Sequence, residues 1–142
     1  MTCSSADTPR PNCIVPEEST RLNAVALTDA KSLIVSLLSD MLPTFRTLVD
    51  SGSEDEFMDS DFATAHRLPT KALPRPLRLR LFDGSSRGMI THYVSVPVRF
   101  PTGESMDIDF LLTTLDPSCV AVLGHRWLTR YNPDIDWVLG RI

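Results

Sequence analysis

The chain has 142 residues, a net charge of −4 and 42% hydrophobic residues, which fits one domain with a tail. The acidic balance argues against nucleic-acid binding, because that function usually shows a basic stripe on the surface. No run of about 18 apolar residues occurs, so we expect no membrane span, and the N-terminus lacks the basic-then-apolar pattern of a secretory signal.

The three cysteines, Cys3, Cys13 and Cys119, predict neither a disulfide framework nor a metal site. Their count is odd and their spacing is irregular. None has a histidine at the spacing of zinc ligands. Free thiols indicate a reducing compartment, so we expect an intracellular, cytoplasmic protein, with a virus-like particle as the alternative setting. We expect no cofactor and no metal.

Composition divides the chain into a tail and a domain. Residues 1–26 are rich in Ser, Thr, Pro, Asn and Glu and predict a disordered tail or linker. The domain is expected over residues 27–142. It opens with strand candidates at 32–38 and 44–49, joined by a turn. A helix over 32–38 is compatible with propensity, but the flanking turn residues and short length favour a hairpin.

The following elements are short and are separated by turn residues. Ser60 is the expected cap of a helix over residues 61–67, which Pro69 ends. Alternating apolar residues predict strands at 77–81, 90–98 and 106–112. The pattern then predicts an apolar strand at 119–124, a helix at 125–131 and a last strand at 135–138. About seven short strands and two short helices indicate a small β-sandwich or barrel.

The candidate catalytic segment is Leu48-Val49-Asp50-Ser51-Gly52. Two apolar residues end a strand and deliver the Asp50 carboxylate, and Gly52 allows a sharp turn and the close approach of another backbone. A second apolar strand ends in Gly about seventy residues later. It consists of Val122, Leu123 and Gly124, and we expect it to support the Asp50 loop from beneath.

Together these segments resemble the retropepsin family, most closely the protease domain of gypsy-type LTR retrotransposon polyproteins. The resemblance covers residues 27–142 and rests on Leu48–Ser53, on Val122–Gly124 and on a glycine-bearing turn. The tail from Trp127 to Trp137 is similar to the segment between protease and reverse transcriptase in such elements. The glycine-bearing turn corresponds to the flap and consists of Asp83, Gly84, Ser85, Ser86, Arg87 and Gly88.

The resemblance implies an all-β, retropepsin-like acid protease fold that works as a homodimer. Each copy contributes one Asp50, the two carboxylates share one proton, and the charged one activates a water. The implied function is an aspartic endopeptidase that cuts a polyprotein bound in extended form. Ser51, Gly52 and Ser53 would support the catalytic loop. Neither nucleic acid nor a membrane is an expected partner, and residues 135–142, with Trp137, are expected to join the two copies.

Three positions depart from the common viral pattern. Ser53 stands where many retropepsins have Ala, so its hydroxyl is able to donate to the Asp50 pair. Glu54 stands where a second Asp is frequent, and His125 stands where Arg is usual. In the viral enzymes that Asp and Arg form an ion pair that braces the dimer. A pair of Glu54 with His125 or Arg126 is the candidate substitute.

Plainer interpretations stand beside these. Asp50 fits an ordinary turn aspartate, and residues 83–88 fit a plain hairpin turn. The acidic run over residues 54–61 is either a solvated face or a calcium site, although it fails the EF-hand pattern at Asp55. His66 and His92 are expected to be structural or surface residues, and Trp127 a core or interface anchor. The alternative functions are an inactive or domesticated module for dimerisation or peptide binding, and a ubiquitin-pathway retropepsin-like domain.

Overall fold

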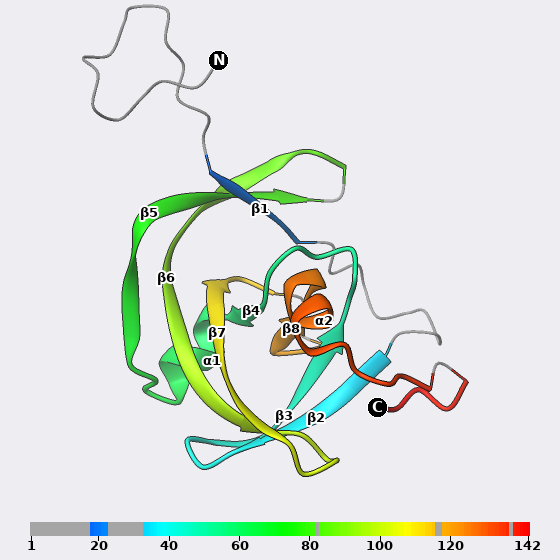
Figure 1. The fold of residues 1–142 in the computed structure, drawn as a ribbon. Helices are drawn as coiled ribbons and strands as arrows, with labels where there is room; N and C mark the ends of the chain where they lie inside the picture. Colours follow the sequence, from blue (N-terminus) through cyan, green and yellow to red (C-terminus); the bar gives the residue numbers. More distant parts are fainter. Residues whose placement is uncertain (1–17, 23–32, 82, 116–117, 137) are drawn as a thin grey trace, which may run out of the picture.

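The structure is a computed structural model that describes residues 18–22, 33–81, 83–115, 118–136 and 138–142. Eight strands and two short helices form along this part of the chain (Figure 1). The strands are β1 (Ser19–Leu22), β2 (Leu33–Ser39), β3 (Leu42–Val49), β4 (Phe57–Asp59), β5 (Thr70–Leu81), β6 (Ser86–Arg99), β7 (Ser105–Thr113) and β8 (Ala121–Leu123). The helices are α1 (Ser60–Ala65) and α2 (His125–Tyr131).

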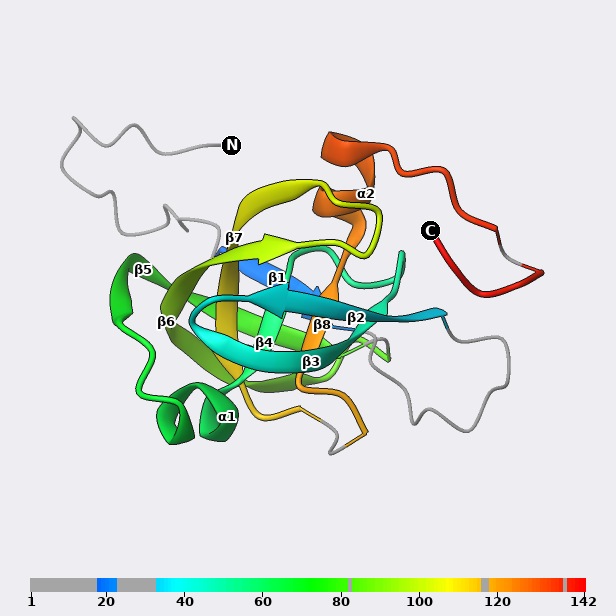
Figure 2. The same ribbon diagram turned by 90° about the horizontal axis from the view of Figure 1, so that it is seen from below.

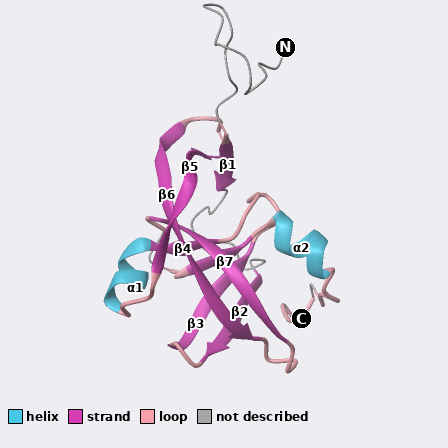
Figure 3. Cartoon of the chain, turned by 60° about the vertical axis from the view of Figure 1, so that its left-hand side comes forward, coloured by secondary structure: helices cyan, strands magenta, loops and turns pink. Residues whose placement is uncertain are grey.

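The strands close into a barrel that carries a projecting hairpin. Neighbours in the sheet run β1-β5-β6-β2-β3-β8-β4-β7, and an additional pairing of β6 with β7 closes the ring from β6 to β7. Strands β5 and β1 lie outside this ring, so the β5–β6 hairpin and β1 project from the barrel (Figure 3). The predicted β-rich domain with two short helices is confirmed.

Alternation of apolar and polar residues explains strand β6, and the flanking turn residues explain the hairpin of β2 and β3. In β6, Val94, Val96 and Val98 are buried while Pro97 and Arg99 between and after them are exposed. The predicted β2–β3 hairpin forms, with Leu33 paired to Val49 at its open end. The strand predicted at 77–81 is longer than expected, since β5 begins at Thr70.

The two helices lie on opposite sides of the barrel (Figure 2). Helix α1 begins at Ser60 and its cap is Asp59, whose carboxylate accepts a hydrogen bond from Phe62 N–H at 3.2 Å. The prediction of Ser60 as the cap was therefore off by one residue, because the carboxylate of Asp59 reaches the first turn. Helix α2 buries Trp127, which stacks on Phe100 and Tyr131. Trp127 is thus a core residue.

Buried apolar residues form two clusters. The larger fills the barrel between β2, β3, β6, β7 and the helices, with Leu37, Phe110 and Leu123 fully buried. The smaller lies between the barrel wall and the hairpin and contains nine residues, which are Leu22, Leu48, Phe57, Leu79, Ile90, Leu111, Leu115, Cys119 and Val122. It joins the projecting hairpin to the wall that carries the Asp50 loop.

Two predictions near the chain ends are wrong. Residues 19–22 form β1, although composition assigned them to a disordered tail, because Thr20 and Leu22 bury their side chains against the domain. In the predicted last strand at 135–138, the described residues 135, 136 and 138 belong to no strand and show one isolated bridge, between Asp136 and Arg141. Trp137, Cys3 and Cys13 lie outside the described residues.

Candidate active site

Asp50 lies directly after β3, where the strand ends and a tight loop begins. Its backbone N–H donates to the carbonyl of Leu123 at 2.9 Å, which fixes the start of the loop on β8. The Gly52 N–H donates to Oδ1 of Asp50 at 2.9 Å. The hydroxyl of Ser53 donates to Oδ2 at 3.4 Å, a long and weak bond. Ser53 is fully buried, whereas Ser51 is exposed.

Val122, Leu123 and Gly124 lie beside this loop. Strand β8 pairs in parallel with β3, with Leu48 opposite Val122 and Val49 opposite Leu123. The Asp50 loop then packs on Gly124 so closely that a Cβ there would overlap the carbonyl oxygens of Ser53 and Asp55. The His125 N–H donates to the Ser53 carbonyl at 2.6 Å. The structure therefore brings the two segments of the expected site together.

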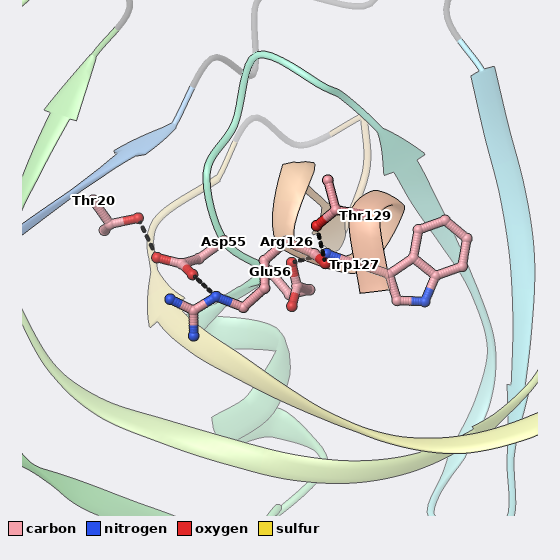
Figure 4. Close-up of polar contacts among 6 residues, drawn as sticks. All are labelled: Thr20, Asp55, Glu56, Arg126, Trp127 and Thr129. Atoms are coloured by element: carbon pink, nitrogen blue, oxygen red, sulfur yellow. Dashed lines mark hydrogen bonds and ion pairs between the residues drawn. The ribbon is translucent and has the colours of Figure 1, made fainter. Parts of the chain in front are cut away.

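Arg126 holds the far end of the loop through Asp55. Its Nε lies 2.9 Å from Oδ1 of Asp55, and the hydroxyl of Thr20 donates to Oδ2 of the same carboxylate at 2.6 Å (Figure 4). The expected pairing of Glu54 with His125 or Arg126 is wrong. The Glu54 carboxylate lies 4.0 Å from Arg21 instead, in an exposed pair.

Glu56 was missed by sequence reasoning and is the buried carboxyl of the site. It accepts a hydrogen bond from Trp127 N–H at 3.3 Å, at the start of α2 (Figure 4). Burial, and next the charge of Asp55, raise the pKa of Glu56 to about 7, against the opposing effect of hydrogen bonds from Trp127 and Gly124. Gly124 has no side chain to cap α2, so Glu56 satisfies N–H groups that a helix start leaves open.

The acidic run is therefore only partly the solvated face that was predicted: Glu54 and Asp61 are exposed, but three other carboxylates are engaged in the fold. Glu56 is buried, Asp55 is paired with Arg126, and Asp59 caps α1 and also accepts from Leu115 N–H at 3.0 Å. Each of these carboxylates serves backbone or side-chain donors of the fold. Within the described ranges, no group of three or more His, Cys, Asp or Glu is arranged to hold a metal ion.

The expected flap is the β5–β6 hairpin. Its tip contains Gly84 at φ 83° and, on the returning strand, Gly88 at φ 98°, a region that favours glycine. Asp83 accepts from both the N–H and the hydroxyl of Ser85 at 2.9 and 2.6 Å, and these bonds lower its pKa. Ser86 accepts from Arg78 at 2.9 Å, and Arg87 is exposed. These side-chain hydrogen bonds of the flap residues are thus all made within the β5–β6 hairpin.

A groove of about 710 Å³ opens between the hairpin stem, β7 and α2. Apolar side chains such as Leu77 and Leu111 line it, and so do charged ones such as Asp55 and Arg126. It borders the same stretch of chain that continues the Asp50 loop. The wall of the groove is therefore mixed in character, and its lining includes neither Asp50 nor the residues of the expected flap tip.

Comparisons with known proteins point the same way. A family model described as the PEG10/RTL1 protease domain matches residues 46–142. The solved structure of the EIAV protease complexed with the inhibitor HBY-793 is similar, with a TM-score of 0.52 and 12% identity over 79% of this chain and 97% of that one. The retroviral protease-like domain of Ddi1 from Leishmania major has a TM-score of 0.54 and 22% identity over 76% and 83%.

The two solved structures support the fold alone, because their identities are low. The roles of Asp50, its loop neighbours, the flap and the β8 segment remain predictions for this chain. In the part of the chain that the structure describes, no helix is long and apolar enough to cross a membrane.

Proposed function

We propose that this chain, which belongs to the PEG10/RTL1 protease-domain family, is one subunit of an aspartic endopeptidase with Asp50 as its catalytic residue. The observation that carries the proposal is the anchored carboxylate. Gly52 N–H holds one oxygen of Asp50 at 2.9 Å while Leu123 holds its backbone. A carboxylate that is fixed at a strand end, yet only partly buried, is positioned to meet a water and a substrate carbonyl.

The second carboxylate comes from a second copy of the chain. Asp50-Ser51-Gly52 is the one Asp-Ser-Gly sequence in the chain, so a complete pair requires a two-fold axis between two copies. Large apolar side chains near the C-terminus support association. Val138 and Leu139 are 93% and 60% exposed, which is a large exposure for residues of this type.

In this dimer the two Asp50 carboxylates share a proton because two charges so close together are unfavourable. The ionised carboxylate removes a proton from water, and the resulting hydroxide attacks the scissile carbonyl carbon. The protonated carboxylate donates its proton to the carbonyl oxygen, which gives a tetrahedral diol. The carboxyl that took the proton of the water then gives it to the amide nitrogen as the C–N bond breaks, and the other carboxylate takes back a proton from the diol as the carboxyl product forms. The flap hairpin, with Gly84 and Gly88, closes over the peptide and excludes bulk water.

The substrate class is an extended polypeptide with apolar residues beside the cleaved bond. Apolar residues of the groove and of the smaller cluster, such as Leu77 and Leu111, support this preference. Backbone pairing with a sheet edge supplies affinity independently of side chains. We propose that the natural substrate is a polyprotein of retrotransposon origin, of gypsy type, that includes this domain.

The decisive experiment compares two Asp-to-Asn variants. Purified chain is incubated with a polyprotein fragment, with and without pepstatin, and products are identified by mass spectrometry. Asp50→Asn should lower the cleavage rate by more than about a hundredfold, since an amide is unable to act as the base. Asp40→Asn, in the exposed turn between β2 and β3, makes the same chemical change and should cleave normally. Undiminished cleavage by Asp50→Asn would end the assignment.

Dimerisation has a separate test. Activity per subunit should fall on dilution below the dimer dissociation constant, because mass action sets the amount of complete site. Leu139→Asp, which places a charge on the exposed apolar end, should move that fall to higher concentration. Specific activity that stays constant while sedimentation reports monomers would refute a site shared between two copies.

A further inference from the structure

Strand β1 bridges the flap hairpin and the segment that follows the Asp50 loop. It runs parallel to β5, from Ser19 opposite Arg78 to Leu22 opposite Leu81. On the hairpin side, Arg78 N–H donates to the Glu18 carbonyl at 3.0 Å. On the other side, Glu54 N–H donates to the Arg21 carbonyl at 2.8 Å. Its backbone is therefore bonded on both sides, to two segments of the expected site.

The side chains of β1 alternate between burial and exposure. Thr20 and Leu22 are 1% and 3% exposed, whereas Ser19 and Arg21 face solvent. Thr20 donates to Asp55 at 2.6 Å, which Figure 4 shows beside the Asp55–Arg126 pair. Leu22 joins the smaller apolar cluster between hairpin and barrel wall. Every second side chain of the strand is thus buried against the domain, Thr20 through a hydrogen bond and Leu22 through apolar packing.

Strand addition of this kind is one of the ways in which proteins bind extended peptides. A peptide strand pairs with a sheet edge through its backbone and places alternate side chains in pockets. Strand β5 is next to last in the sheet order, and β1 covers its outer edge. Glu54, whose N–H binds β1, is only four residues beyond Asp50. The edge and the amide that would receive a substrate are both occupied by the chain itself.

We propose that Ser19–Leu22 occupies, within the same chain, a peptide-binding cleft between the outer edge of β5 and the Glu54 N–H, from which a substrate polypeptide has to displace it. The identity of the cleft rests on the proposed function. Ten residues join Leu22 to the start of β2 at Leu33, and a short linker of this kind holds an attached segment at a local concentration in the millimolar range. Weak contacts are then enough to keep the cleft filled and to slow the binding of a separate peptide.

Leu22 is the residue to change. Its burial is worth about tenfold to a hundredfold in binding, so Leu22→Asp should release the strand. Ser19→Asp puts the same charge on the same strand at an exposed position and is the matched control. Thr20→Val keeps the shape and removes the bond to Asp55, and should give a smaller release. It also keeps the test valid if Leu22→Asp lowers the stability of the fold.

The experiment measures binding rather than cleavage. The 142-residue chain that also carries Asp50→Asn is titrated with a fluorescent peptide of residues 16–25, and affinity is read by anisotropy. Leu22→Asp should bind the peptide about tenfold or more tightly than the parent, Thr20→Val should lie between them, and Ser19→Asp should match the parent. Hydrogen exchange at the Glu54 and Arg78 amides should accelerate in the same order.

Unchanged peptide affinity in both Leu22→Asp and Thr20→Val would overturn the proposal, and so would unchanged exchange at Glu54 and Arg78. This result is distinguishable from failure of the proposed function. Loss of the protease assignment would appear as cleavage that survives Asp50→Asn, whereas the peptide titration contains no catalytic step.

Discussion

Arg126 Nε lies 2.9 Å from Oδ1 of Asp55, and this ion pair ties helix α2 to the end of the Asp50 loop. The other oxygen of Asp55 accepts from Thr20. The two contacts make one carboxylate the meeting point of the loop, of α2 and of β1. Because the Asp55 side chain is only 14% exposed, while the Arg126 side chain is 71% exposed, the carboxylate depends on these partners more than the guanidinium does.

Arg126→Gln should lower the free energy of unfolding by about 0.5–1 kcal/mol, since a pair with one exposed partner contributes modestly. Arg130→Gln removes the same charge one turn later on the same exposed helix face and should change stability by less. Urea unfolding of both variants checks this. The loss in Arg126→Gln should shrink as salt rises, because salt screens the pair; equal losses in the two variants would mean that only net charge matters.

Glu56 predicts a dependence of stability on pH. Its pKa is raised from 4.5 to about 7 in the folded protein, so the unfolded chain loses this proton at lower pH than the folded one. The contribution of Glu56 to the free energy of unfolding is therefore most favourable below about pH 4.5. It declines as pH rises and levels off above about pH 7. The full decline corresponds to at most about 3 kcal/mol.

Glu56→Gln should remove this decline while keeping an acceptor for Trp127 N–H. The free energy of unfolding of the variant minus that of the parent should therefore be larger at pH 8 than at pH 5. Glu104→Gln, at an exposed position in the β6–β7 turn, is the control and should leave the pH profile of unfolding unchanged. A parent whose stability stays flat between pH 4.5 and 7 would contradict the raised pKa.

Gly124 should tolerate no side chain, for steric reasons rather than backbone conformation. An added Cβ would overlap the carbonyl oxygens of Ser53 and Asp55, so Gly124→Ala should destabilise the fold by about 2–3 kcal/mol. It should also lower cleavage by displacing the Asp50 loop. His125→Ala, at the exposed next position, should do neither. Thermal unfolding and a cleavage assay test both, and a stable, fully active Gly124→Ala would show that the loop shifts freely.

Gly88 and Gly103 separate flap motion from turn stability. Both have positive φ, 98° and 96°, and both have open space around the position of a Cβ. Gly88→Val and Gly103→Val should therefore lose similar stability, about 1–3 kcal/mol, through backbone strain. Only Gly88→Val should also slow cleavage beyond what its folded fraction explains, since Gly88 lies on the flap hairpin. Equal activity per folded molecule would identify residues 83–88 as a plain turn.

The amino-acid sequence by itself determined the features that depend on near neighbours. Alternating apolar residues predicted the strands that became β5, β6 and β7, and the apolar pair before Asp50-Ser51-Gly52 predicted a carboxylate at a strand end. These succeed because period-2 alternation and glycine turns express the local chain geometry. The same local rules placed the second apolar segment at Val122–Gly124 without showing how closely it packs.

Only the tertiary structure decided which polar groups are buried and which segments share a sheet. Glu56 and Asp55 look like ordinary solvated acids until α2 brings N–H groups and Arg126 to them from about seventy residues away. Residues 19–22 have the composition of a tail, yet the open edge of β5 and the Glu54 N–H make them a strand. Residues 135–138 fit a strand locally, but among the described residues no sheet edge receives them. Burial and strand pairing depend on partners that are distant in sequence, and alternation within one segment carries no record of them.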